Sequence, residues 1–448
     1  MRIVMIGAGY VGLVSGSCLS EFGHEVTCVE KDPARLRALQ AGMVPIFEPG
    51  LDEVIAANVR AGRLSFDSEL SAVARADAVF IAVGTPARRG DGHADLSYVF
   101  TAAEEIARHL DSYTVVVTKS TVPVGTGRRV QEIIRSARPD ADFDVASNPE
   151  FLREGSAIED FRRPDRVVVG CVSERAREVM REIYRPLFIN ETPMLFSGRE
   201  SAELIKYASN AFLATKITFI NEMADLCEQV GADVQDVARG VGVDKRSGSK
   251  FLHAGPGFGG SCFPKDTLAL LKTSQDHGVG SRIVESVVAV NDSRKLAMAD
   301  RIAAAFGGNL TGRTVAILGL TFKPNTDDMR DAPSLAIVPA LKAMGANVRA
   351  YDPEGMEQAR SLMDVDTCAD AYEAMEGADG LVLLTEWNEF RALNLVRVAS
   401  LLMEELIVDL RNIYAPEQMR SYGFRYISIG RAQVIPAPAA VADSVAAE

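Results

Sequence analysis

The sequence predicts an α/β protein in which a long central helix and a helical middle domain join two doubly wound domains. Two observations predict this fold class. Short apolar runs alternate with amphipathic stretches over the first 195 residues and again after residue 313, and most of the segment between them has helical periodicity. We therefore expect domains at residues 1–195, 196–300 and 301–432, followed by a flexible tail at 433–448.

The first domain is expected to contain a parallel sheet. Helical patterns lie between most of its apolar runs, and this alternation is typical of a sheet covered on both faces. The expected strands are Arg2–Ile6, Glu25–Val29, Ala78–Val83, Thr114–Thr118 and Phe143–Ser147.

A long helix is expected from about Ser201 to Val230, because apolar residues recur there at helical spacing and proline is absent. Its length, about 45 Å, suffices to link two domains and to form the contact surface of a homodimer. Residues 232–295 also have a helical pattern, which the stretch Gly255–Gly260 interrupts. The strands expected in the last domain are Thr314–Gly319, Asn347–Tyr351, Gly380–Leu384, Glu405–Asp409 and Arg425–Ile429.

Composition excludes several classes of protein. With 47% hydrophobic and 24% charged residues, the 448-residue chain has an ordinary composition for a globular enzyme. Its net charge of -13 disfavours nucleic acid and anionic membranes as partners. Apolar runs of the ~20 residues that a membrane span needs are missing. The six cysteines are scattered without CxxC spacing, so we expect no metal site and a cytoplasmic location.

The strongest local signal near the start is a dinucleotide-binding fingerprint. Gly7, Gly9 and Gly12 follow the first strand and open a helix, and Glu30 ends the second strand. The glycines permit a tight turn and close approach of the backbone to pyrophosphate, as in a Rossmann-like domain. Because the Glu30 carboxylate can bind a ribose 2′-hydroxyl and repels a 2′-phosphate, NAD is the expected cofactor.

Further cofactor contacts are expected around this fingerprint. Ligands in open α/β sheets bind at the carboxyl ends of strands, and Thr85 and Thr121 each follow such an end. Their hydroxyls are placed to meet cofactor or water, although ordinary turn chemistry explains them equally well. Arg35 is either a partner of the adenosine moiety or a solvated helix residue.

Cys262 is the candidate nucleophile. It lies in the glycine-rich stretch Gly255–Asp266, where Pro264 is suited to be the first residue of a helix. A cysteine just before a helix N-terminus is stabilised as the thiolate, whereas the other five cysteines lie in apolar periodic contexts typical of the core.

Two polar residues share one face of the long helix. Lys206 and Asn210 are four residues apart among apolar neighbours, and an ammonium with an amide suits a developing oxyanion. A second segment, Asn148–Glu154, follows a strand end and offers carboxylates for acid/base work.

These segments together resemble the UDP-glucose/GDP-mannose dehydrogenase family, in its motif order, over roughly residues 1–430. The motifs that carry the resemblance are GAGYVG at 7–12, STVPVGT at 120–126, NPEFLREG at 148–155, KYASNAF at 206–212, FLHAGPGFGGSCFPKD at 251–266 and GLTFKPNTDDMRDAPS at 319–334.

The resemblance implies oxidation of the C6 alcohol of a nucleotide sugar to a carboxylate with two NAD+, and we expect UDP-glucose as the substrate. Cys262 would capture the aldehyde and carry a thioester that water releases. Lys206 and Asn210 would hold the oxygen on C6, and Asp266 and Thr121 would position or activate water. Glu150 and Glu154 would assist proton transfer, and Glu154 and Cys262 would also approach the nicotinamide.

The resemblance also assigns binding residues. The cofactor would contact Gly7, Gly9, Tyr10, Val11, Gly12 and, from the last domain, Arg330. Lys323 would contact the nucleotide sugar, and Arg246 and Arg411 are further candidates. The backbone expected around sugar and base comprises Phe151, Leu152, Arg153, Phe251, Leu252, His253, Ala254, Gly255 and Gly259.

Three alternatives stay open at this point. Oxidation of GDP-mannose would use nearly the same catalytic residues. A two-electron dehydrogenase of hydroxy acids or sugar phosphates could use the lysine and asparagine but has no role for Cys262. A non-catalytic NAD-binding protein would leave this set of side chains unexplained.

Overall fold

The computed structural model describes residues 1–86, 88 and 93–435 and contains two compact units. Unit 1 comprises Met1–Phe212 and Lys265–Ser281, and unit 2 comprises Leu213–Pro264 and Arg282–Glu448. Most of the expected tail, residues 436–448, lies outside the described residues. The expected domain boundaries at residues 195, 300 and 432 stay a prediction.

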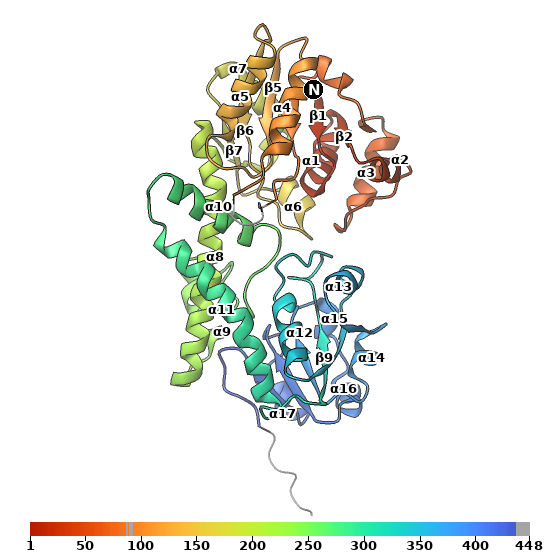
Figure 1. Ribbon diagram of the computed structural model, residues 1–448, viewed down its shortest axis with the longest axis vertical. Coiled ribbons are helices and arrows are strands. Elements are labelled where there is room, and N and C mark those ends of the chain that lie inside the picture. The colour runs from red at the N-terminus through yellow and green to blue at the C-terminus, as the bar shows by residue number, and fades with distance from the viewer. Residues whose placement is uncertain (87, 89–92, 436–448) are drawn as a thin grey trace, which may run out of the picture. The chain divides into compact units, whose positions relative to one another are not determined.

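Unit 1 is built on an eight-stranded sheet with the order β3-β2-β1-β4-β5-β6-β7-β8. Figure 1 labels β1, β2, β5, β6 and β7 of this sheet. The first six strands in this order pair in parallel, in the arrangement of dinucleotide-binding sheets. The strands are β1 Arg2–Ile6, β2 Glu25–Val29, β3 Leu64–Asp67, β4 Ala78–Ile81, β5 Thr114–Thr118, β6 Phe143–Ser147, β7 Val167–Gly170 and β8 Met194–Ser197.

The sheet differs from the purely parallel one expected. β7 pairs with β6 in the antiparallel sense through Ser147 and Gly170, and β8 then runs parallel to β7. Strands β3, β7 and β8 were not expected from the sequence. In β3 and β8 the side chains are largely exposed or half-buried, so these edge strands lack the continuous apolar run that marks a buried strand.

Helices cover both faces of this sheet. Successive residues of a strand point to opposite faces. Ile3 and Met5 accordingly belong to a core with α1, whereas Val4 and Ile6 belong to a core with α4 and α5. The helices of unit 1 are α1 Tyr10–Glu21, α2 Pro33–Gln40, α3 Leu51–Arg60, α4 Ser97–His109, α5 Thr126–Ala137, α6 Ala157–Arg162 and α7 Glu174–Tyr184, with 3-10 turns at Ser71–Arg75 and Arg185–Asn190.

Unit 2 contains the second doubly wound sheet, which confirms the predicted fold class. Its six strands pair in parallel in the order β11-β10-β9-β12-β13-β14. They are β9 Thr314–Leu318, β10 Asn347–Tyr351, β11 Asp366–Thr367, β12 Gly380–Leu383, β13 Leu406–Asp409 and β14 Arg425–Ser428. The helices are α9 Val234–Val243, α11 Arg282–Ala305, α12 Ser334–Ala343, α13 Met356–Leu362, α14 Ala371–Met375, α15 Asn388–Arg391, α16 Leu395–Leu401 and α17 Pro416–Ser421.

The long helix α8 (Arg199–Val230) has 32 residues and begins two residues before the expected start. Its first part is fixed to the sheet of unit 1 by Glu203, which accepts hydrogen bonds from the backbone N–H groups of Gly125 and Gly127, both at 2.7 Å, and from the Ser147 hydroxyl at 3.0 Å. These bonds satisfy N–H groups at the start of α5. In the described part of the chain, no helix combines the length and the apolar character needed to cross a membrane.

Candidate active site

The glycine fingerprint forms a close-packed turn between β1 and α1. Gly7 has a φ of 98°, and a Cβ added at Gly12 would lie 1.9 Å from the Gly7 carbonyl oxygen. Side chains at these positions would therefore push the turn apart. Around Gly9, in contrast, nothing lies within 4 Å of an added Cβ. The start of α1 thus leaves room for a phosphate beside backbone N–H groups.

Glu30 lies at this turn, as the sequence predicts. Its carboxylate accepts hydrogen bonds from the backbone of Ala8 at 3.2 Å and of Asp32 at 2.9 Å, and Arg35 lies 3.5 Å away. The next strand ends contribute Thr85, whose hydroxyl donates to the Thr121 carbonyl at 2.9 Å. The structure therefore brings the loops after β1, β2, β4 and β5 to the carboxyl edge of the sheet, and the room at Gly9 and the carboxylate of Glu30 fit a dinucleotide.

Tyr10 has a structural contact that the sequence did not reveal. Its hydroxyl donates to the buried Glu48, which also accepts hydrogen bonds from the backbone N–H groups of Gly155 at 2.6 Å and Ala157 at 2.7 Å. Burial, followed by the Glu48 carboxylate, raises the pKa of Tyr10. Glu48 thereby joins the fingerprint helix to the end of the loop that carries Glu150 and Glu154.

Lys206 and Glu150 form a buried ion pair, with 3.1 Å between Nζ and Oε1. Their side chains are 3% and 5% exposed. The second carboxylate oxygen of Glu150 accepts the backbone N–H of Leu152 at 2.5 Å, and the Lys206 ammonium lies 5.4 Å from the centre of the Phe151 ring. The predicted lysine and the predicted carboxylate are thus in direct contact, and Glu150 is not the surface glutamate that is commonest in proteins.

One helical turn further on, Asn210 donates to Asp266 at 2.6 Å. Asp266 lies in the first turn of α10 (Phe263–Asp276), is fully buried, and also accepts from Lys265 at 2.7 Å. Unit 1 therefore holds two adjacent polar pairs, each with one donor and one carboxylate. This arrangement suits the binding of an oxygen that gains negative charge, together with proton transfer.

Lys119 also belongs to this region, although it was not expected there from the sequence. It follows β5, is 4% exposed, and donates to Asn148 Oδ1 at 3.1 Å and to the Tyr184 hydroxyl at 3.2 Å. Burial lowers its pKa to about 8. In the sequence, its role is indicated only by its position directly after the buried strand β5. That position is a weak signal, because most lysines at the start of a loop are solvated.

The glycine-rich loop of Cys262 belongs to unit 2, where it packs backbone to backbone. A Cβ at Gly259 would lie 2.3 Å from the carbonyl oxygen of Asp331, and one at Gly260 would lie 2.7 Å from the Phe322 ring. The N–H of Gly260 donates to the Arg330 carbonyl at 2.7 Å. Only glycine fits at Gly259, so this loop and the loop after β9 form one compact structure.

Helices α8 and α11 fix the other side of the same loop. Gly255 donates its N–H to Asn221 at 2.8 Å and accepts from Arg294 at 2.7 Å, and Phe258 donates to Asn291 at 2.8 Å. These three buried side chains were not selected from the sequence, where polar residues on a helix do not reveal their burial. Their hydrogen bonds hold the backbone of the loop in place at Gly255 and Phe258.

Cys262 lies directly before α10, which begins at Phe263, one residue earlier than expected from Pro264. Its side chain is half-buried, whereas the other five cysteines are buried. Burial raises the pKa of Cys18 and of Cys28 to about 12. Position and exposure thus distinguish Cys262 from the core cysteines in the way that a reactive thiol requires.

The remaining predicted contacts differ in their surroundings. Arg411 of unit 2 pairs with Glu386 at 3.1 Å and would lie 3.2 Å from a Cβ at Gly255. Arg330 pairs with Asp328 at 2.8 Å with a largely exposed side chain, and the Lys323 ammonium lies 5.4 Å from the Phe322 ring. Leu252 and Ala254 bury their side chains in the core, so their predicted substrate contact would come from the backbone.

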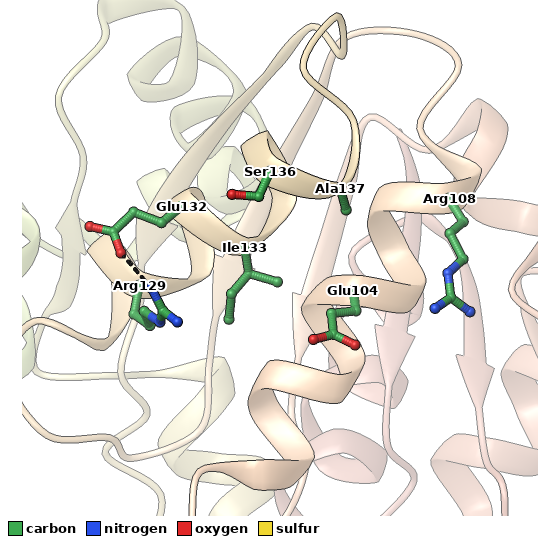
Figure 2. A pocket seen from close by; sticks show the side chains of 7 residues that line it. All are labelled: Glu104, Arg108, Arg129, Glu132, Ile133, Ser136 and Ala137. Atoms are coloured by element: carbon green, nitrogen blue, oxygen red, sulfur yellow. Dashed lines mark hydrogen bonds and ion pairs between the residues drawn. The ribbon is translucent and has the colours of Figure 1, made fainter.

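Two predicted arginines are engaged by neighbouring carboxylates. Arg153 pairs with Asp160 and Arg246 with Asp244, both at 2.6 Å, and the Arg246 side chain is 90% exposed. A pocket lined by residues of α4 and α5 contains none of the predicted site residues (Figure 2), and an ion pair in it joins Arg129 and Glu132 at 2.9 Å. The pocket is lined by Glu104, Arg108, Arg129, Glu132, Ile133, Ser136 and Ala137.

Three family models match successive parts of the chain. They describe the NAD binding domain at residues 1–188, the central domain at 200–293 and the UDP binding domain at 316–416 of one family. The chain belongs to the UDP-glucose/GDP-mannose dehydrogenase family. This confirms the resemblance inferred from the motifs, and NAD is the cofactor of the domain formed by β1 to β6.

Relatives within the UDP-glucose/GDP-mannose dehydrogenase family match almost the whole chain. A UDP-glucose 6-dehydrogenase of Rhizobium meliloti is 64% identical over 96% of this chain and 100% of its own length. UDP-glucose 6-dehydrogenase TuaD of Bacillus subtilis is 47% identical over 97% of this chain and 94% of its own. A solved UDP-glucose dehydrogenase from Pyrobaculum islandicum superimposes with a TM-score of 0.88 at 38% identity, covering 96% of this chain and 98% of that one.

Proposed function

We infer that the protein is an NAD-dependent UDP-glucose 6-dehydrogenase that converts UDP-glucose, two NAD+ and water to UDP-glucuronate and two NADH. The observation that carries this inference is the 64% identity with a UDP-glucose 6-dehydrogenase along that relative's entire length. The site supports it, because it offers a thiol and a lysine–asparagine pair as well as a dinucleotide turn. A two-electron dehydrogenase has no use for the thiol.

We propose that Cys262 forms the covalent intermediates. NAD, when bound, accepts the hydride removed from C6 in each of the two oxidation steps. After the alcohol has lost one hydride and one proton, the thiolate adds to the aldehyde carbon and the carbonyl oxygen gains a proton. The resulting thiohemiacetal loses the second hydride and a proton to become a thioester. Water then adds, the C–S bond breaks, and the acid leaves with Cys262 restored as the thiolate.

Lys206 and Asn210 are proposed to hold the oxygen on C6. Both side chains are donors, and an ammonium beside an amide stabilises the negative charge that this oxygen gains when the alcohol is deprotonated and when the thioester is attacked. Glu150 and Glu154 are proposed to accept and return protons. Asp266 and Thr121 are proposed to position the water that releases the product.

Binding of UDP-glucose is proposed to rest on unit 2. Lys323 and Arg411 bring positive charge to a chain with a net charge of -13, and phosphate groups need such local cations. The backbone around Phe251–Gly255 and at Gly259, with that of Phe151–Arg153 from unit 1, is proposed to surround sugar and base. Arg330 is proposed as a cofactor contact and Arg246 as a weaker substrate contact.

The decisive assay counts NADH. Purified protein with limiting UDP-glucose and excess NAD+ is expected to form two NADH per sugar, because the four-electron oxidation retains the aldehyde on the protein. A ratio of one would contradict the proposed function and indicate a two-electron dehydrogenase. In parallel reactions, a higher kcat/KM with GDP-mannose than with UDP-glucose would overturn the assignment of the substrate. Activity with NADP+ in place of NAD+ is expected to be weak, because the Glu30 carboxylate repels a 2′-phosphate.

We also propose a homodimer formed through α8. Phe212, Phe219 and Leu226 follow each other at seven-residue spacing and are 65%, 45% and 52% exposed, although they are large and apolar. Residues at this spacing form one stripe along a helix, and such stripes are stabilised by contact with a second helix. Two copies related by a two-fold axis would bury the stripe of each against the other.

Substituting glutamate for Phe219 is expected to convert this dimer to a monomer, because two charges would be buried at the centre of the contact. Light scattering coupled to gel filtration measures the mass directly. The matched control is Val172→Glu, since Val172 is also a large apolar residue, is 77% exposed and lies outside α8, in the segment before α7. A Phe219→Glu variant with the mass of the wild type would exclude α8 as the dimer contact.

We propose a cytoplasmic location because the cysteines are free thiols. All six lie in the described part of the chain, none takes part in a disulfide, and five are buried. Thiols that persist in this way are typical of a reducing compartment.

A further inference from the structure

Lys119 is a buried cation for which the reaction outlined above has no role. Only 4% of the residue is exposed. Taking an ammonium group out of water costs free energy that good partners only partly offset. A buried lysine beside an acid/base site therefore calls for a reason beyond folding, since an apolar side chain of similar length would fill the same space.

The ammonium of Lys119 holds the start of the loop that carries Glu150. Asn148 accepts from Lys119 at 3.1 Å and from the Tyr184 hydroxyl at 2.6 Å, and its own amide donates to the Val168 carbonyl at 2.7 Å. The centres of the Phe161 and Tyr184 rings both lie 5.8 Å from Nζ, so aromatic faces take the place of water around the charge. Asn148 is two residues before Glu150, and its position limits that of the carboxylate.

Lys119 also interacts electrostatically with the ion pair of Lys206 and Glu150. Burial lowers the pKa of Lys119 to about 8, attraction by Glu150 partly opposes this, and repulsion by Lys206 adds to it. The other titratable group in contact is Tyr184, whose pKa is raised by burial, so it stays neutral. Lys119 is therefore charged at neutral pH and loses this charge as the pH rises through about 8.

We propose that Lys119 is a positioning residue of the acid/base site, whose ammonium fixes the loop of Glu150 and adds a second positive charge beside Lys206. This charge favours a negatively charged oxygen on the substrate. The proposal rests on the proposed function, because it assigns Lys119 to the same reaction.

The test compares turnover of wild-type protein and of Lys119→Met across pH 6 to 10, at saturating UDP-glucose and NAD+. The wild type is expected to be about tenfold faster than the variant below pH 7. Removing one nearby positive charge raises the activation free energy by about 1.4 kcal/mol, which corresponds to a tenfold lower rate. Above pH 8 the ratio should shrink, because the wild-type lysine then also becomes neutral. A ratio that does not change with pH would reduce Lys119 to a structural residue and overturn the proposal.

Lys119→Arg keeps the charge at this position at every pH of the test, and it keeps the test decisive if the methionine variant does not fold. Its guanidinium stays charged above pH 8, so its rate relative to the wild type is expected to rise as the pH passes about 8; a constant relative rate contradicts the proposal. Lys342→Met is the control, and its rate should follow that of the wild type across the pH range. Lys342 lies on α12, far along the chain from the acid/base residues, and forms an ion pair with Asp364. If the wild type forms no NADH from UDP-glucose, the proposed function fails and this inference falls with it; if only the pH dependence is missing, the proposed function stands.

Discussion

Replacing Cys262 by serine is expected to lower steady-state formation of UDP-glucuronate by about 10³-fold or more, the scale on which loss of a nucleophile acts. A hydroxyl before α10 is not ionised at neutral pH, so it adds to the aldehyde slowly and leaves an ester that water hydrolyses poorly. The first hydride transfer does not need the thiolate. Rapid mixing should therefore still show NADH formation, followed by arrest, and mass spectrometry should find a sugar ester on the variant.

Cys227→Ser is the matched control, because it replaces sulfur by oxygen in the same way at a cysteine that is buried in the core of unit 2. It is expected to lose some stability but to keep its turnover per folded molecule. If Cys262→Ser kept the wild-type rate, the covalent pathway would be excluded and a hydrated aldehyde would have to be the second substrate.

Replacing Lys206 by methionine is expected to affect both activity and stability. Removing one donor to a developing oxyanion typically lowers kcat by about 10²- to 10³-fold. The variant would also leave the Glu150 carboxylate buried at 5% exposure without its ammonium partner. Breaking a buried pair in this way typically costs about 3 to 5 kcal/mol. Chemical denaturation measures the loss of stability, and initial rates measure the loss of activity.

The double variant Lys206→Met with Glu150→Gln separates the two effects. Because it removes both charges, it is expected to regain much of the stability that the single variant loses, while its turnover stays low. Equal stability of the single and double variants would contradict the importance of the buried pair. A double variant with wild-type turnover would exclude both side chains from the reaction.

The sequence predicted those parts of the fold that rest on continuous apolar runs. Strands β1, β2, β5 and β6 have the bounds expected, because most residues of each are buried and apolar. The reversed direction of β7 and β8 was not predictable, since residue pattern indicates a strand but not which neighbour it pairs with or in which sense. β11 has only two residues and carries too little pattern to be recognised.

The candidate site was predictable where residue type and spacing carry the chemistry. The proximity of Glu30 to the glycine turn and the shared face of Lys206 and Asn210 both follow from local rules. The supporting residues were not predictable, because their importance comes from burial. Glu48 and Lys119 have the appearance of solvated charges in the sequence, and only the folded chain shows that each holds a loop of the site.

The hydrogen bonds of Glu203 to the start of α5 and to Ser147 fix where the first part of α8 lies against the sheet of unit 1. Glu203 and Lys206 are three residues apart, so the hydrogen bonds of the former set the height at which the latter meets Glu150. One inserted residue between them would turn every later side chain by about 100° and move it along the axis by about 1.5 Å. Chains that keep this chemistry can therefore vary the length of their surface loops, but not the number of residues in this single turn.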